Sequence, residues 1–320
     1  MMVDFISRVA YTFDMQRFKV CSVRSPLLCL LVVLLMTTGC VPETFKFQNE
    51  IGKGGGGRGQ FQGVTDIALT PDGNIVVADA GNNRFQVISP KDGSVKLMGG
   101  EYGTTGLKLQ SLSGCGVNPT TGDILICDYR GGKVVKFDKG GNPILRIVEK
   151  VRYPMDVACD TSGNTYVIMS KQPAIHKYDL LGNFVEVLGG KGKSALVHAT
   201  SIFVVDQSMY VADYGSRRVL KMNLKGEVQQ EFAQKGEYEP LKGPSGVFVD
   251  LTGNLFLLDL GEVPVVMLDP QGNLISRIGA YGREPGQFVY PRGIVCGEGS
   301  DVYVMDNSRN VLLFFKKTAQ

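Results

Sequence analysis

Residues 76–89, VVADAGNNRFQVIS, contain the pattern that decides the fold. An apolar run ends at Asp79, a short polar turn follows, and a second apolar run starts after Arg84. Short apolar runs separated by Gly, Asn and Ser are typical of paired β-strands. Five further copies follow in the chain: LICDYRGGKVVKFD (125–138), YVIMSKQPAIHKYD (166–179), YVADYGSRRVLKMN (210–223), FLLDLGEVPVVMLD (256–269) and YVMDNSRNVLLFFK (303–316).

These copies recur at a nearly constant interval. The residue that ends the first run of each copy is called its marker here; the markers are Asp79, Asp128, Met169, Asp213, Asp259 and Asp306. Successive markers are 49, 41, 44, 46 and 47 residues apart. A period of about 40–50 residues made of short strands is typical of β-propeller blades.

Each repeat contains four strand-like stretches. In the fifth they are SGVFVDL, NLFLLDL, VPVVMLD and NLISRIG, and turns such as LTGN (251–254) and PQGN (270–273) join them. Gly and Asn tolerate the positive φ angles of tight hairpins. The sequence therefore predicts an all-β chain, a six-bladed β-propeller of four-stranded antiparallel blades.

The sixth repeat ends after its third strand, VLLFFKK (311–317). The segment TFKFQNEIG (44–52) has an outer-strand pattern and precedes the first inner strand. It is followed by GRGQF (57–61), which matches the PGQF (285–288) that leads into the sixth repeat. We expect this N-terminal strand to complete the last blade and close the ring, because an open ring would expose unpaired strand edges.

The repeat resembles the NHL repeat over residues 44–317. The copies most similar to it are Gly63–Ser89, Pro244–Asp269 and Pro291–Phe314, including PGQFVYPRGIV and VYVMDNSRNVLLFF. Two repeats depart from the pattern: the third has Met169 as its marker, and the fourth has a shortened turn at Asp206. The resemblance implies a propeller, but a fold does not by itself define a function. For animal NHL proteins it also implies a basic face that binds single-stranded RNA.

The first forty residues have the organisation of an export signal. Arg17, Lys19 and Arg24 precede the apolar run LLCLLVVLLM (27–36), and small residues lead to Cys40. Ten apolar residues are fewer than the roughly 20 that a membrane-spanning helix needs. The ending resembles a bacterial lipobox with Cys40 as the lipidated residue, although Thr37 stands where Leu is usual.

We therefore expect two parts, a signal or membrane anchor over 1–40 and the propeller over 41–320. The predicted location is extracytoplasmic, either membrane-anchored or secreted. An uncleaved signal anchor and a plain secretory signal are the alternatives, and Met15 is a second candidate start.

Composition restricts the chemistry. The chain has 34 Lys and Arg against 31 Asp and Glu, and only two histidines, His176 and His198. Four cysteines fall in expected strands without metal-binding spacing, and buried free thiols are the default for such positions. A Cys115–Cys159 bridge is an alternative that the sequence does not decide.

Two motifs are assigned structural roles. A repeated Asp at a strand end accepts backbone N–H groups and fixes the turn, so the marker aspartates are not expected to hold a metal. GKGGGG (52–57) matches a dinucleotide-binding motif by letter, but it joins two strands and no helix follows it, so we interpret it as a connector.

The mouth of the central channel is the predicted binding site. Tyr153, His198 and Tyr290 stand just before inner strands, and Arg292 is close to them in sequence. Related propellers include peptidyl-hydroxyglycine amidating lyases, whose metal centre uses several histidines, and lactonases with a central Ca²⁺. Neither ligand set is evident here, so no metal and no cofactor is expected, and enzymatic activity is left open but not favoured.

One face of the propeller is expected to be basic. The loops that open on it carry many Lys and Arg residues, whereas turn-forming Asp residues gather on the other face. No series of aromatic residues for base stacking is evident on the basic face. Its proposed binding residues are Arg84, Arg130, Arg217, Arg218 and Arg309.

The sequence thus favours an exported, membrane-tethered, monomeric NHL-type propeller that acts as a non-enzymatic binding or scaffold module. Its expected partner is a protein, an anionic glycan or a lipid headgroup, and no nucleic acid is expected. The alternatives are a lyase or hydrolase at the channel mouth that uses His198, Tyr153 and Arg292, and an RNA-binding module if the chain stays in the cytosol.

Overall fold

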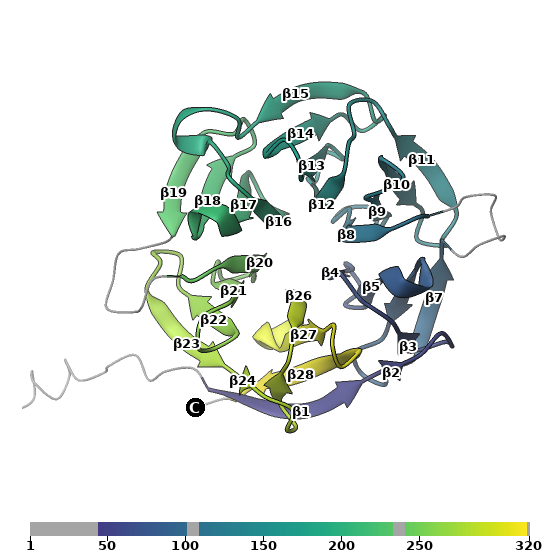
Figure 1. Ribbon diagram of the computed structural model, residues 1–320, viewed down its shortest axis with the longest axis vertical. Coiled ribbons are helices and arrows are strands. Elements are labelled where there is room, and N and C mark those ends of the chain that lie inside the picture. Colours follow the sequence, from purple (N-terminus) through teal and green to yellow (C-terminus); the bar gives the residue numbers. More distant parts are fainter. Residues whose placement is uncertain (1–43, 101–108, 233–240, 319–320) are drawn as a thin grey trace, which may run out of the picture. The chain divides into compact units, whose positions relative to one another are not determined.

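The computed structural model describes residues 44–100, 109–232 and 241–318. In these ranges, six antiparallel sheets of four strands form a ring around a central channel (Figure 1). The predicted six-bladed β-propeller is therefore confirmed. Helical structure in the described residues is limited to short 3₁₀ turns: η2 (Ala80–Asn82), η3 (Gly192–Ser194), η4 (Tyr214–Ser216) and η5 (Glu298–Ser300).

Five blades are continuous in sequence and run from an inner to an outer strand. The first two are β4 (Asp66–Leu69), β5 (Ile75–Asp79), β6 (Arg84–Ile88), β7 (Val95–Gly99), then β8 (Leu112–Val117), β9 (Ile124–Asp128), β10 (Lys133–Phe137), β11 (Pro143–Ile147). The third is β12 (Pro154–Cys159), β13 (Thr165–Met169), β14 (Ala174–Tyr178), β15 (Phe184–Leu188). The next two are β16 (Ala199–Val205), β17 (Ser208–Asp213), β18 (Arg218–Asn223), β19 (Val228–Phe232), then β20 (Pro244–Val249), β21 (Leu255–Asp259), β22 (Val265–Leu268), β23 (Leu274–Ile278).

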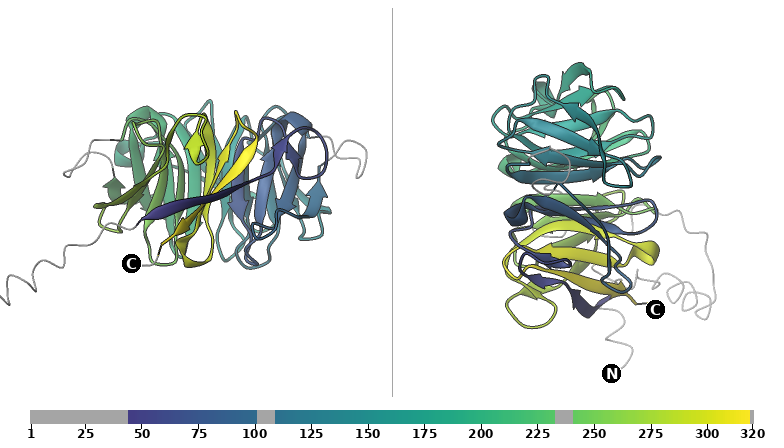
Figure 2. Two further views of the ribbon diagram at one scale, coloured as in Figure 1. Left: turned by 90° about the horizontal axis from the view of Figure 1, so that it is seen from below. Right: turned by 90° about the vertical axis from the view of Figure 1, so that its right-hand side faces the viewer.

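The sixth blade combines both ends of the described chain. Its strands are β26 (Pro291–Cys296), β27 (Val302–Asp306), β28 (Val311–Lys317) and β1 (Phe45–Ile51). β1 pairs antiparallel with β28, with Phe45 opposite Lys317, and runs along the outside of this blade (Figure 2). Phe47 also packs edge-on against Phe315, with the ring centroids 5.7 Å apart. The predicted closure by an N-terminal outer strand is confirmed.

The two similar lead-in sequences, GRGQF and PGQF, take up the same structure. Each forms a two-residue parallel ladder, β2 (Lys53–Gly54) with β3 (Gln60–Phe61) and β24 (Ala280–Tyr281) with β25 (Gln287–Phe288). Phe61 and Phe288 are fully buried at the ends of these ladders. Residues 52–57 therefore connect β1 to β3, as the sequence analysis expected, but they also contain the short strand β2.

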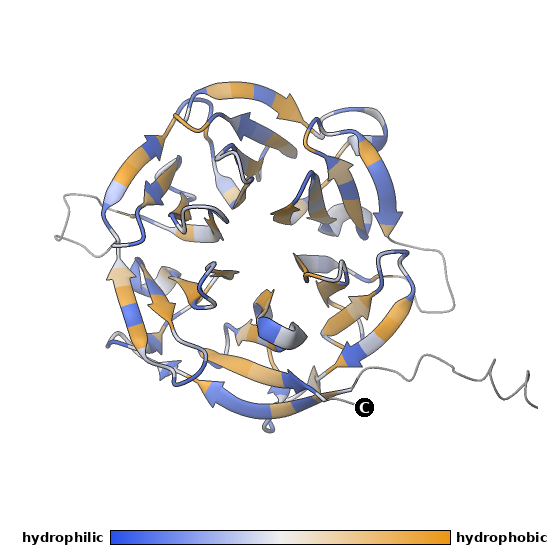
Figure 3. Ribbon diagram, turned by 180° about the vertical axis from the view of Figure 1, so that it is seen from behind, coloured by the Kyte–Doolittle hydropathy of each residue, from blue (hydrophilic) through white to orange (hydrophobic). Residues whose placement is uncertain are grey.

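The hydrophobic core lies between neighbouring blades. The two middle strands of each blade are buried on both faces; β5 and β9, for example, contain no exposed residue. Outer strands alternate between polar and apolar side chains, which Figure 3 shows as blue and orange bands. Sheets that pack face to face need this gradient, because the middle strands are covered on both faces whereas the outermost strand borders solvent.

The marker aspartates connect each blade to the segment that enters it. We call the residues directly before an inner strand its lead-in. The Asp213 carboxylate accepts hydrogen bonds from the backbone N–H groups of Val197 (3.1 Å) and His198 (2.9 Å) in the lead-in of β16. Asp79, Asp128, Asp259 and Asp306 accept the corresponding bonds in their blades, and all five markers are buried. The markers accept backbone N–H groups, as expected. Their main donors, however, lie 15 to 18 residues earlier in the chain and not in the adjoining turn.

We expect Asp213→Ala to lower the free energy of unfolding by about 3–5 kcal/mol, because it leaves the buried Arg218 Nε without its carboxylate and removes the acceptor of two lead-in N–H groups. Denaturant unfolding measures this. Asp138→Ala is the control, since that carboxylate caps an exposed hairpin turn. Similar losses in the two variants would contradict the role assigned to the markers.

Candidate functional site

The central channel has a volume of about 1220 Å³ and is lined by all six inner strands. Its two mouths differ in the loops that surround them. One mouth is bordered by the lead-ins and the loops between second and third strands, and we call this side the lead-in face. The other is bordered by the turns that join first and second strands, and we call it the hairpin face. Pockets of this kind, with apolar walls and few polar groups, are the usual form of ligand sites.

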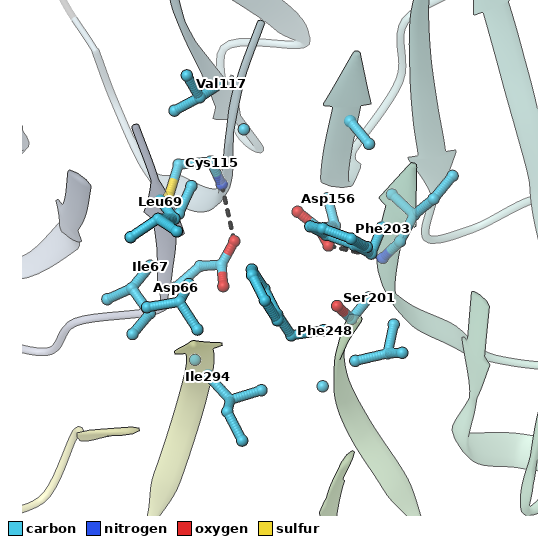
Figure 4. Close-up of a pocket in the computed structure, with 18 of the residues that line it drawn as sticks. Asp66, Ile67, Leu69, Cys115, Val117, Asp156, Ser201, Phe203, Phe248 and Ile294 are labelled. Carbon is cyan, nitrogen blue, oxygen red and sulfur yellow. Dashed lines mark hydrogen bonds between the residues drawn. The ribbon is translucent and has the colours of Figure 1, made fainter. Parts of the chain in front are cut away.

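Two carboxyl groups lie inside the channel (Figure 4). Asp66 of β4 accepts the N–H of Cys115 (2.9 Å), and Asp156 of β12 accepts the N–H of Ile202 (2.8 Å). Each aspartate therefore links its inner strand to the next blade. Both carboxyl groups flank β8 at Gly114, where a Cβ atom would lie 2.6 Å from Asp156 Oδ1. Only glycine fits there.

Both carboxyl groups have raised pKa values. Burial raises the pKa of Asp156 from 3.8 to about 6, although hydrogen bonds from Ile202 and Val157 oppose this shift. Burial also raises the pKa of Asp66 well above its usual value, and the nearby charge of Asp156 adds to the effect. Two carboxyl groups in one water-poor site resist simultaneous ionisation, so protons are held there at a pH where surface aspartates have lost theirs.

The predicted mouth residues lie on the lead-in face in three separate groups. The Arg292 guanidinium lies over the Tyr290 ring, 4.3 Å from its centroid, and donates to the Tyr290 hydroxyl. His198 packs edge-on against Tyr214 at 5.6 Å. Tyr153 contacts two further side chains, Tyr129 at 5.3 Å and the Lys171 ammonium at 3.9 Å.

The structure thus joins Tyr290 to Arg292 and gives His198 and Tyr153 other partners. His198 and Arg292 border the channel. The exposed fractions of Tyr153, Tyr214 and Tyr290 are 37%, 38% and 42%, so their rings are accessible to a ligand. The face therefore carries accessible tyrosine rings in separate groups, and whether they act as a series for base stacking stays a prediction.

Three of the five proposed face arginines are engaged within the fold. Arg84 is 4% exposed, and its Nε lies 2.8 Å from the carboxylate of its marker, Asp79. Arg218 contacts Glu231 and lies 3.5 Å from its own marker, Asp213. Arg309 binds Glu50 of the closing strand and the carbonyl of Gln287. These residues compensate buried or partly buried carboxylates, so including them in an open basic face was wrong.

Arg130 and Arg217 remain as exposed cations. Both lie in loops between second and third strands and are solvent-exposed. Among the described residues, neither has an ion-pair partner. The basic character of the lead-in face therefore depends on fewer residues than predicted, and these lie close to the tyrosines described above.

Four residues of the site were not singled out by the sequence analysis. Tyr129 and Tyr214 directly follow the markers Asp128 and Asp213, a position that the fold brings to the lead-in face. Asp66 and Asp156 stand where repeats two, five and six carry glycine: Gly114, Gly246 and Gly293. Comparing the repeats position by position would have found both pairs.

Several other features are settled within the described residues. Cys115, Cys127, Cys159 and Cys296 are buried free thiols, so the alternative Cys115–Cys159 bridge is absent. No group of three or more His, Cys, Asp or Glu side chains in these ranges is placed to hold a metal ion. None of their helices has the length and apolar character needed to cross a membrane. Cys40, Met15 and the apolar run 27–36 lie outside the described residues.

Comparison with known proteins agrees with this architecture. Residues 61–88 match the family model of the NHL repeat. The chain is 28% identical over 130 residues to the B-box type zinc finger protein ncl-1 of Caenorhabditis elegans, and 25% identical over 133 residues to Protein brain tumor of Drosophila melanogaster. These matches cover 40% and 41% of this chain, but only 15% and 13% of the two relatives.

Solved structures share the fold at low sequence identity. A virginiamycin B lyase from Staphylococcus aureus aligns with a TM-score of 0.59 and 13% identity, over 86% of this chain and 100% of that one. A protein of unknown function from Bacteroides thetaiotaomicron aligns with a TM-score of 0.64 and 19% identity, over 85% and 76%. Fold and channel thus define a six-bladed β-propeller. More particularly, it is a propeller that contains an NHL repeat.

The raised pKa of Asp156 gives a stability prediction. Between about pH 4 and 6 the folded state binds more protons at this site than the unfolded state, so its contribution to stability falls as pH rises. We expect Asp156→Asn to reduce this slope in urea unfolding at several pH values. Asp138→Asn is the control: hydrogen bonds to Asn142 lower the pKa of Asp138, so its effect belongs below pH 4. An unchanged slope in Asp156→Asn would contradict the assignment.

Proposed function

We propose that this propeller is a non-enzymatic binding module, exported and tethered to a membrane, whose partner contacts the lead-in face around the channel mouth. The observation that carries the proposal is the set of accessible tyrosine rings beside cations, above all Tyr153 with Lys171 and Tyr290 with Arg292. Aromatic rings and arginines are the residues that most often dominate binding energy at interfaces.

An anionic glycan fits this chemistry best. The flat face of a tyrosine ring packs against the apolar C–H face of a sugar, while guanidinium groups bind carboxylate or sulfate groups in a fixed geometry. Exposed Arg130 and Arg217 supply such groups. We further propose that the protein is a monomer and acts outside the cytoplasm, where acidic glycans are exposed.

Single-stranded RNA is the second candidate partner. Accessible tyrosines next to cations also suit the stacking of unpaired bases. The cellular location of the protein distinguishes the two candidate partners, because an exported chain does not meet RNA routinely.

We expect the double variant Arg130→Ala/Arg217→Ala to bind heparin more weakly than the unchanged protein. Each arginine that contacts heparin should account for a loss of at least tenfold in affinity, because a charge-assisted hydrogen bond contributes about 1.5–3 kcal/mol. Titration with fluorescent heparin at two salt concentrations measures this. The control, Lys139→Ala/Lys225→Ala, removes the same charge from exposed turns on the hairpin face. Equal losses in both variants would reject a specific face, and tighter binding of a single-stranded RNA oligonucleotide than of heparin would favour the second candidate.

Membrane tethering is tested separately. We expect Cys40→Ser to move the protein from the membrane fraction to the soluble extracytoplasmic fraction, because serine cannot carry the thioether-linked lipid of a lipobox cysteine. Cell fractionation and mass spectrometry of the Cys40 peptide measure this, with Cys296→Ser as the control for the loss of a thiol. Continued membrane association of Cys40→Ser would exclude a lipid anchor at this residue.

A further inference from the structure

The interior of the channel differs chemically from the lead-in face. Apolar side chains from several inner strands form its wall, including Ile67, Val117 and Ile294 (Figure 4). Phe203 and Phe248 pack against each other there, with ring centroids 4.6 Å apart. The wall therefore offers an apolar surface to a small molecule, with aromatic rings on one side.

Asp66 and Asp156 are the carboxyl groups within this wall. Asp66 of β4 and Asp156 of β12 lie on either side of β8, and β4 is also next to β26, the strand of Ile294 (Figure 4). Asp66 accepts the N–H groups of Cys115 and Ile67, Asp156 accepts those of Val157 and Ile202 and the hydroxyl of Ser201, and the two carboxyl groups also bond each other. Each carboxylate offers about four lone-pair sites, so part of their accepting capacity stays free. The remaining sites can accept hydrogen bonds from a molecule in the channel.

The charges along the channel have one dominant sign. Five further acidic residues line it from the turns of the hairpin face: Asp72, Asp160, Asp206, Asp250 and Glu298. Among the described lining residues, Arg292 is the one arginine and there is no lysine; it lies at the other mouth, as does His198. A cleft lined by one sign of charge between low-dielectric walls concentrates ions of the opposite sign.

From this arrangement we infer that the channel binds a small organic cation with an apolar body, such as an aryl-alkyl ammonium, which enters from the hairpin face. The cationic group lies between Asp66 and Asp156, and the apolar body packs against Phe203 and Phe248. This site is separate from the lead-in face and does not depend on the function proposed for that face.

Proton exchange follows from the same contacts. The groups that face the two carboxyls are the thiols of Cys115 and Cys127, whose pKa values burial also raises, and the neutral hydroxyl of Ser201. In the described ranges, no cation forms an ion pair with these two carboxyl groups, and a bound ammonium favours their ionised form. Binding should release protons and strengthen as pH rises from 5 to 8.

The test uses the full-length protein and three probes of one shape: 2-naphthylmethylammonium, the neutral 2-naphthylmethanol and the anionic 2-naphthoate. Isothermal titration in buffers of different ionisation enthalpy measures affinity and proton release. We expect the cation to bind at least tenfold more tightly than the alcohol and to release protons on binding. We expect the anion not to bind. Equal affinity for cation and alcohol, or no cation binding at about 10 mM, would overturn the inference.

Variants locate the site. Asp66→Asn and Asp156→Asn should each reduce cation affinity to near that of the alcohol and abolish part of the proton release. Asp138→Asn, outside the channel, should leave both unchanged. Phe248→Ala keeps both carboxyls and should weaken cation and alcohol alike, so it tests the site even if an aspartate variant fails to fold. Unchanged cation affinity in all three channel variants would place the binding elsewhere.

Discussion

The carboxylates of the buried markers are the interaction on which the propeller depends. Each accepts backbone N–H groups from the lead-in of its own blade, so it ties the end of a second strand to the entrance of the first. A buried carboxylate needs such donors, and a lead-in that crosses from one blade to the next has N–H groups without strand partners. Each side thus satisfies a requirement of the other. The same bonds place His198 and Tyr290 at the channel mouth.

The third blade shows what happens without this interaction. Met169 occupies the marker position and is buried as an apolar residue. Its lead-in still makes the backbone bond from Ser170 N–H to the Tyr153 carbonyl that other blades make at this point, with Tyr153 at a φ of 54°. That tyrosine then packs with Tyr129 and Lys171 rather than repeating the arrangement of other blades.

Periodicity made the fold predictable. Strand length, turn chemistry and the incomplete sixth repeat each depend on a few consecutive residues, so they can be predicted directly from the sequence. The candidate site was only partly predictable, because its chemistry depends on contacts between distant residues. The sequence does not distinguish the five arginines proposed for the basic face. In the structure, Arg84 and Arg218 pair with marker carboxylates. Arg130 and Arg217 face solvent. Asp66 and Asp156 are 90 residues apart, and their proximity arises only when β4 and β12 flank β8.

The closing strand affects how the molecule folds. β1 belongs to the blade whose other strands are the last to be synthesised, so its partner β28 does not exist while most of the chain is being made. Five blades can form in order from local contacts, whereas the sixth must join segments from opposite ends, a non-local step that is slow in general. Completion of the ring therefore requires β28, and loss of either β1 or β28 would leave the same blade incomplete.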